Sequence, residues 1–309
     1  MSFIEDHNSF VDAIKKLIED KDYIRASTLL KNKLVKEPEV SVFQLFYFEV
    51  LIQLHKYKEA KLWLKKFIAK CKSQTDVYYY EGLYYFLEDN LNQSMESLGK
   101  CFKRKVYYLK KLSTDDTFDL LKETKEFKKL IKPAKVFQVN EFISLKLIFS
   151  KTLIYVCGDL FLTCQKVALN LAPNEFEKYD NFDDIDGAVD FYESKASKEE
   201  VIITPEEEFW VHCSNLQTWV ENKYNTNILT KYLSFPILEE LSQRGISYFV
   251  TIFKEEIISR IKTGGIKILL YFIEGDYLNY LSEEDFFDSL LSIEDAEIIR
   301  NISNLIPLR

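Results

Sequence analysis

Three stretches decide the fold: YIRASTLLKNKL at residues 23–34, YKEAKLWLKKFI at residues 57–68 and LNQSMESLGKCF at residues 91–102. They follow one another at a spacing of 34 residues. Each stretch has a large residue, a small residue three positions later and a leucine four positions after that, which is the spacing of one buried helical face. The three sets are Tyr23, Ala26 and Leu30; Tyr57, Ala60 and Leu64; and Leu91, Ser94 and Leu98.

Each of these helices is predicted to be the second of a pair. The predicted pairs are 3–20 with 22–34, 41–55 with 57–71, and 75–88 with 91–108. In the third pair, Tyr78, Gly82 and Tyr85 give the first helix two large residues and a small one that lets its partner approach. A 34-residue helix pair with small residues so placed resembles the tetratricopeptide repeat. The resemblance covers about the first 105 residues, and an unrelated helical bundle is the alternative.

After the third pair, residues 114–131 read as two short helices that cover the apolar end of the stack, with Phe118, Leu121, Phe127 and Leu130 facing inward. Pro133 then ends the helical pattern. We therefore predict a tetratricopeptide-like α-solenoid domain over residues 1–135.

The period changes from 3.6 to 2 beyond this point. Residues 143–149 and 152–156 are predicted strands with a turn at Ser150 and Lys151, and Gly158 and Asp159 turn the chain into a third strand at 160–171. These strands make a small β-meander that connects two helical domains, over residues 136–173.

Residues 174–309 are predicted to form a helical domain of HEAT-like character, so the whole chain is mainly α. Thr204, Pro205 and Glu207 form a capping box for its clearest helix. Further helices are expected at 183–194, 228–244, 246–263, 265–281, 283–291 and up to residue 306. The stretch EFWVHCSNLQTWVENKYNTNIL, which starts at Glu208, resembles a helical-repeat module of archaeal and bacterial proteins to which no chemistry is assigned.

Composition and charge limit the classes to which this protein can belong. The chain has 309 residues, 47% of them hydrophobic, with no apolar run of membrane length and with five acidic residues among the first twenty. We therefore expect a cytoplasmic protein with no membrane partner. The five cysteines are spread widely without a CxxC motif, which favours neither disulfides nor zinc.

Net charge is −8, from +6 in residues 1–135 and −14 in residues 136–309. Opposite charges lead to the hypothesis that the C-terminal unit packs on the array.

The resemblance implies a partner peptide on the concave face of the array. One subclass of the family grips a terminal carboxylate with Lys and Asn on successive first helices, and only Lys15 fits that pattern here. The other positions give a mostly apolar lining. The predicted partner-binding groove contains Lys15, Leu45, Glu49, Tyr79, Leu83 and Phe86. The alternative is that the C-terminal unit covers this face.

Three other patterns are weaker. The basic and aromatic run at residues 103–111 could contact nucleic acid, but the acidic chain and helical packing of the tyrosines disfavour it. Residues 182–193 partly match a calcium loop, although Phe182 stands where the first ligand belongs. His212 and Cys213 are adjacent on one helix, so their side chains diverge by about 100°.

No catalytic or cofactor motif occurs in the chain. We therefore expect a scaffold or adaptor that binds a protein partner, with no catalysis, no metal and no cofactor. The competing hypothesis is an enzyme whose site lies between the two units, near Cys157, Asp159 and His212.

Overall fold

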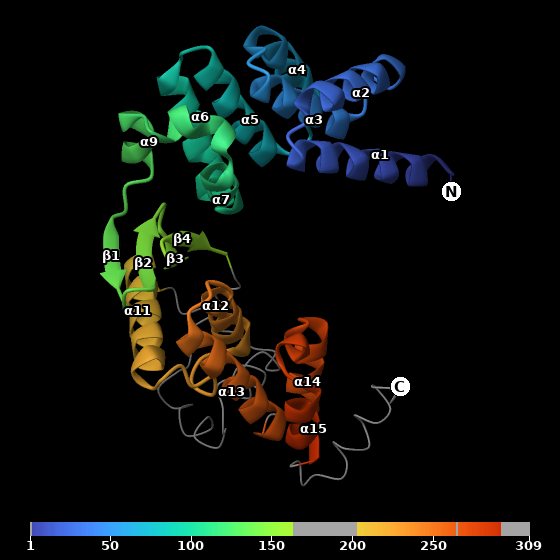
Figure 1. The fold of residues 1–309 in the computed structure, drawn as a ribbon. Helices are drawn as coiled ribbons and strands as arrows, with labels where there is room; N and C mark the ends of the chain where they lie inside the picture. Colours follow the sequence, from blue (N-terminus) through green and yellow to red (C-terminus); the bar gives the residue numbers. More distant parts are fainter. Residues whose placement is uncertain (1, 163–202, 264, 292–309) are drawn as a thin grey trace, which may run out of the picture. The chain divides into compact units, whose positions relative to one another are not determined.

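The chain is mainly α-helical with one small antiparallel sheet, as the sequence predicted (Figure 1). The computed structural model describes residues 2–162, 203–263 and 265–291. It divides into an N-terminal unit, residues 1–132, and a C-terminal unit, residues 133–309. Within the described ranges, no helix is both long enough and apolar enough to span a bilayer.

The N-terminal unit begins with three helix pairs. They are α1 (Ser2–Glu19) with α2 (Tyr23–Lys36), α3 (Ser41–Gln53) with α4 (Tyr57–Lys70), and α5 (Gln74–Leu87) with α6 (Leu91–Arg104). Because α2 also packs on α3, and α4 on α5, the pairs form one continuous stack. The prediction of consecutive packed helices is confirmed, although the helix predicted at 91–108 ends at Arg104.

The repeated small residues and leucines explain this stack. Ala26, Ala60 and Ser94 have no exposed surface, and neither do the leucines that follow each of them by four residues. The large residue that opens each set is less buried, and Tyr57 is 43% exposed. The buried face therefore consists of the small residue and the leucine, which lie one helical turn apart.

Gly82 sets the distance between α5 and α6. A Cβ atom at this position would lie 2.5 Å from Cγ of Leu98, closer than two carbon atoms can pack. At the same place the Ser94 hydroxyl donates a hydrogen bond of 2.7 Å to the Gly82 carbonyl oxygen. The third helix pair therefore needs both a glycine and a small hydroxyl residue where its two backbones meet.

Four short helical segments close the N-terminal unit. They are α7 (Tyr107–Thr114), η1 (Asp116–Phe118), α8 (Asp119–Lys122) and α9 (Lys125–Leu130). Phe118, Leu121 and Phe127 are buried as predicted. The α9 helix packs on α6, where the ring of Phe127 lies 6.4 Å from the ring of Phe102.

The sheet of the C-terminal unit has the strand order β1-β2-β3-β4, with all neighbours antiparallel. Its strands are β1 (Lys135–Gln138), β2 (Ile143–Ile148), β3 (Lys151–Val156) and β4 (Asp159–Phe161). The β1 strand begins at the predicted domain boundary and was not identified from the sequence, because four residues with one Lys and one Gln carry little strand signal. Most of the third strand predicted at 160–171 lies outside the described residues.

Both hairpin turns lie one residue earlier than predicted. Ile148 pairs with Lys151, so the first turn consists of Phe149 and Ser150, and both have a positive φ. Val156 pairs with Asp159, so the second turn consists of Cys157 and Gly158, again with positive φ values. Two consecutive left-handed residues are the geometry of a tight two-residue hairpin. Phe149 and Cys157 gave no sequence signal for it.

Five helices and one 3-10 turn make up the rest of the described C-terminal unit. They are α11 (Pro205–Glu221), α12 (Lys231–Gln243), α13 (Ser247–Thr263), α14 (Gly265–Glu274), η3 (Tyr277–Tyr280) and α15 (Glu283–Leu291). The capping box at Thr204 is confirmed, because both of its reciprocal hydrogen bonds form. The helix predicted at 265–281 stops at Glu274. The helices predicted at 183–194 and up to 306 lie outside the described residues.

The sheet and these helices share one hydrophobic core. It includes fully buried residues from both: Leu145 and Ile154 from the strands, Trp219 from α11 and Phe235 from α12. The α11 helix packs against β2 and β3, and α12 also contacts β3. The strands and the helices of the C-terminal unit therefore form a single folded body.

Candidate functional site

The residues of the predicted groove do not form one open surface. Tyr79 and Leu83 are only 1% and 2% exposed, so the prediction that they face a partner does not agree with the structure. The cause is α7, which brings the Tyr108 ring to 4.7 Å from the Tyr79 ring. Just beyond α7, the ring of Phe118 lies 6.4 Å from that of half-buried Phe86. The closing segments of the same unit thus occupy the part of the groove along α5.

The three remaining groove residues lie on α1 and α3. Lys15 is exposed on α1 and pairs with Asp12, its Nζ atom 3.8 Å from Oδ1. Leu45 is half-buried on α3. One turn later on α3, Glu49 faces a pocket. Of the six predicted residues, Glu49 alone belongs to the lining of this pocket.

This α3–α7 pocket has a volume of about 620 Å³ and lies within the N-terminal unit. Its walls come from the end of α1, the turn into α2, the second half of α3, the end of α7 and the loop after α7. The lining residues are Ile18, Lys21, Tyr23, Glu49, Val50, Gln53, Lys111, Thr114, Asp115, Asp116 and Thr117. Most of the residues that line the pocket are therefore polar or charged, where the sequence predicted an apolar groove.

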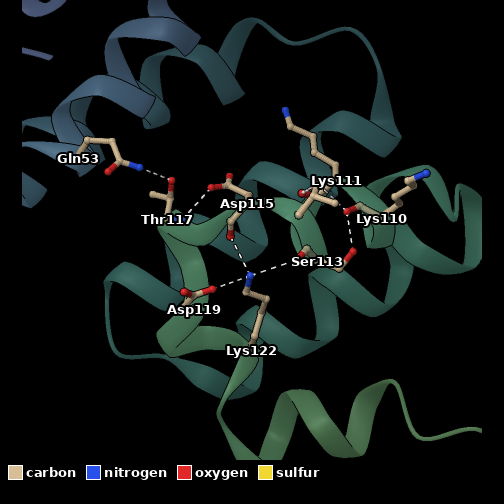
Figure 2. A network of polar contacts seen from close by, with 9 residues as sticks. Gln53, Lys110, Lys111, Ser113, Asp115, Thr117, Asp119 and Lys122 are labelled. Carbon is tan, nitrogen blue, oxygen red and sulfur yellow. Dashed lines mark hydrogen bonds and ion pairs between the residues drawn. The ribbon is translucent and has the colours of Figure 1, made fainter. Parts of the chain in front are cut away.

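A network of polar contacts fixes the loop that forms one wall of the pocket (Figure 2). The ammonium group of Lys122 donates to the carbonyl oxygens of Ser113 at 3.3 Å and Asp115 at 3.0 Å. The same group pairs with Asp119 at 2.6 Å. Lys122 thus places a positive charge at the C-terminal end of α7, where the free carbonyl groups favour it.

The loop is also tied across the pocket to α3. Nε2 of Gln53 donates a 2.6 Å hydrogen bond to the hydroxyl of Thr117, which lies 64 residues further along the chain (Figure 2). The backbone N–H of Thr117 donates to the Asp115 carboxylate at 2.9 Å. The wall of the pocket is thereby held at two points, which keeps the side chain of Asp115 in place before any ligand arrives.

Among the charged groups of the pocket, Glu49 has a perturbed pKa. Burial raises the pKa of its carboxyl group, Lys111 counteracts this rise, and nearby Asp115 adds to it. The side chain keeps 38% of its surface exposed, so solvent screens part of this effect. The Lys111 ammonium is 3.9 Å from the Glu49 carboxylate, which is too far for a good hydrogen bond.

Two buried tyrosines lie beneath Lys111. Its ammonium group is 5.4 Å from the ring centre of Tyr79 and 5.6 Å from that of Tyr80, both within cation–π range. Burial raises the pKa values of both hydroxyl groups far above the usual range; Glu49 adds to both rises, and Asp115 adds to that of Tyr79. Both tyrosines therefore stay neutral at physiological pH.

The sequence prediction missed most of the pocket because its residues come from α7 and from two turns. A signal for α7 existed: continuing the 34-residue spacing beyond the third pair places the next first helix near residue 108, and α7 begins at Tyr107. Reading one more repeat would have indicated that α7 packs beside α5. No comparable signal identified Lys21, Gln53 or Thr117.

The residues of the alternative enzyme hypothesis lie in three different environments. Cys157 is half-buried in the β3–β4 turn, and burial raises its thiol pKa, which works against a thiolate nucleophile. Asp159 pairs with Arg244 at 2.7 Å. His212 is 2% exposed on α11, and burial lowers its pKa although Glu208 lies 3.7 Å away. The described structure shows no nucleophile and base in contact among them.

The other weak patterns have simple structural roles or lie outside the description. In the basic run, Tyr108 is buried as expected, while Tyr107 is 58% exposed. The calcium-like loop at 182–193 lies outside the described residues. Within the ranges that are described, no group of three or more His, Cys, Asp or Glu residues is arranged to hold a metal ion.

Compared with protein-family models, with curated proteins and with solved structures, the chain gives no match.

Proposed function

We propose that the N-terminal unit is a tetratricopeptide-like binding module whose α3–α7 pocket holds a segment of a partner protein. The observation that carries this proposal is the pocket itself: about 620 Å³, lined by residues of α1, α2, α3 and α7 and of the loop after α7, with this loop held in place by hydrogen bonds. A cavity of this size can take a few side chains of an extended peptide.

The assignment to tetratricopeptide-like repeats is supported by burial at equivalent positions. Ala26, Ala60 and Ser94 are fully buried at a spacing of 34 residues, and Gly82 allows close approach of α5 and α6. In arrays of this type the first helices of successive pairs lie side by side and form the binding face. Here α1, α3 and α7 supply the pocket, and α7 follows α5 by one repeat.

The polar residues of the lining determine which kind of partner segment the pocket can bind. An amphipathic helix needs a continuous apolar groove, but the apolar part of this face, at Tyr79 and Leu83, is already covered. An extended segment with charged side chains suits a pocket that contains five charged residues. The proposed module is thus an adaptor for a short polar peptide.

The test is a selection of displayed random peptides on the full-length chain, followed by affinity measurements with the enriched peptides. Replacing Thr114, which is exposed at the pocket, by Trp should fill the pocket and weaken binding about tenfold or more, equivalent to about 1.4 kcal/mol. Fluorescence anisotropy of labelled peptides measures this change.

Thr28→Trp is the matched control. Thr28 is also exposed on a helix, and its hydroxyl donates to the carbonyl four residues earlier at 3.0 Å, as that of Thr114 does at 3.1 Å. It lies on α2 and does not line the pocket. Peptides that bind the Thr114→Trp and Thr28→Trp variants equally well would refute the proposal, as would a selection that enriches no peptide.

A further inference from the structure

The charges around the α3–α7 pocket do not balance. Three carboxylates, those of Glu49, Asp115 and Asp116, face two ammonium groups, those of Lys21 and Lys111. Glu49 and Asp115 line the same pocket, and the negative charge of Asp115 adds to the rise in the pKa of Glu49, so the two like charges repel. A positive group placed between them would relieve both this repulsion and the cost of burying Glu49.

Lys111 does not supply that positive group fully. Its ammonium donates to the Tyr80 hydroxyl at 3.4 Å and lies over two tyrosine rings, which holds it on the α5 side of the pocket. At 3.9 Å from Glu49 it gives charge attraction without a short hydrogen bond. The Glu49 carboxylate therefore keeps acceptor capacity for another donor.

A second, separate observation comes from Tyr79. Its side chain is 1% exposed, and among the described residues its hydroxyl has no hydrogen-bond partner. Buried hydroxyl groups in proteins almost always have a partner. Tyr79 does not line the pocket itself, but the ammonium group of the lining residue Lys111 is 5.4 Å from the centre of its ring. Within the described part of the chain, this region thus contains a hydroxyl group without a hydrogen-bond partner, in addition to its carboxylates.

The lining also has an apolar strip. Ile18, Tyr23 and Val50 line the same pocket as the carboxylates. Arginine and lysine side chains combine an apolar stem with a positive head, so they match both parts of this lining. Tyr23 adds an aromatic ring that favours a cation.

From these observations we infer that the α3–α7 pocket binds the basic side chain, arginine or lysine, of the partner segment, with the positive head between Glu49 and Asp115. This inference rests on the proposed function and names the chemistry of its ligand. An acidic side chain would meet three carboxylates against two ammonium groups, of which Lys111 is already engaged with Tyr80.

The test uses single-residue probes on the isotope-labelled full-length chain. N-acetyl-arginine N-methylamide is titrated while the amide signals of Gln53 and Thr117 are followed by NMR. The citrulline analogue has the same length without the charge, and lysine and glutamate analogues complete the series. We expect saturable shifts with the arginine and lysine probes, the stronger of the two showing which head group is preferred, and none with the neutral or acidic probe.

Two variants test whether the probe binds in the pocket. Glu49→Gln should weaken binding of the basic probe about tenfold, because a charge-assisted hydrogen bond is lost. Glu126→Gln, on an exposed residue of α9, is the matched control and should leave binding unchanged. Equal shifts from the arginine and citrulline probes, or an unaffected Glu49→Gln variant, would overturn the inference.

Outcomes for this inference and for the proposed function are separable. Selected peptides that lose affinity in Thr114→Trp but contain no basic residue would overturn the inference and leave the binding module in place. A selection without any enriched peptide would instead refute the module itself.

Discussion

The two units of the chain build their cores in different ways. In the N-terminal unit each helix packs on the next one along the chain, from α1 through α6. In the C-terminal unit the contacts join distant residues: Asn140 donates to the Tyr224 hydroxyl across 84 positions, and Arg244 pairs with Asp159 across 85. An array of neighbours is encoded by a local period, whereas a shared core is encoded by residues that no local pattern connects.

Particular charged groups of the two units also differ in how closely they are paired. In the C-terminal unit, Glu256 accepts hydrogen bonds from both the backbone N–H and the hydroxyl of Thr226, each at 2.8 Å. Arg260, which is 1% exposed, donates to the side chain of Asn227. In the N-terminal unit, the ion pair that Glu49 makes among the described residues is the 3.9 Å contact with Lys111. Charged groups with short hydrogen bonds are typical of a structural core, and a pocket carboxylate with a raised pKa and a distant ion pair is typical of a binding site.

The strongest test of the difference between the two cores is the substitution Phe235→Ala. The Phe235 ring has no exposed surface and lies 4.8 Å from the ring of Phe272 and 5.9 Å from that of Tyr277. Its loss should destabilise the C-terminal unit by about 3–5 kcal/mol. Because the sheet and helices share one core, hydrogen exchange should accelerate in β2 and β3 as well as in α12. Phe287→Ala, at a ring 44% exposed, is the control.

Faster exchange in α12 with an unchanged sheet would contradict the shared core. It would mean that the strands fold separately from the helices.

Gly82→Ala tests the array with a smaller effect. The new methyl group would overlap Leu98, at 2.5 Å from Cγ and 2.7 Å from Cδ2, so α5 and α6 must separate. We expect a loss of about 1–3 kcal/mol, measured by chemical denaturation. The faster exchange should be confined to the helices around this pair, because each pair contacts only its neighbours.

Gly99→Ala is the matched control, since the added methyl group would meet the tip of the Leu130 side chain at 3.2 Å and nothing closer. A cost equal to that of Gly82→Ala would show that helical glycine itself, rather than the close approach, matters at both positions.

The smallest expected effect concerns Glu49 and the difference in how charged groups are paired. Its folded-state pKa is raised from 4.5, first by burial, so the folded chain holds this proton more tightly than the unfolded chain does. Stability should therefore fall as pH rises from 4.5 through the raised pKa. Glu49→Gln removes this cost and should raise the melting temperature at neutral pH, with no difference remaining below pH 4.5.

Thermal unfolding of both proteins across this pH range measures the effect. A Glu49→Gln variant that melts lower than the wild type at pH 7 would show that the carboxylate stabilises the unit, and would remove the contrast between the two units.

The sequence by itself determined what depends on local order. The 34-residue spacing fixed the helix pairs, because residues such as Ala26 and Leu30 lie one turn apart on one helix and are buried against its neighbours. The capping box at Thr204 fixed the start of α11 for the same reason, since its hydrogen bonds span three residues. The alternation of residues 143–156 likewise indicated two strands.

Only the tertiary structure decided what depends on distant residues. It placed Tyr108 and Phe118 over α5, so that Tyr79 became core instead of binding surface. It brought Gln53 to Thr117, 64 residues away, and so created a polar pocket around Glu49. No period or motif links such residues, because their proximity follows from how whole helices pack and where side chains fill the space between them.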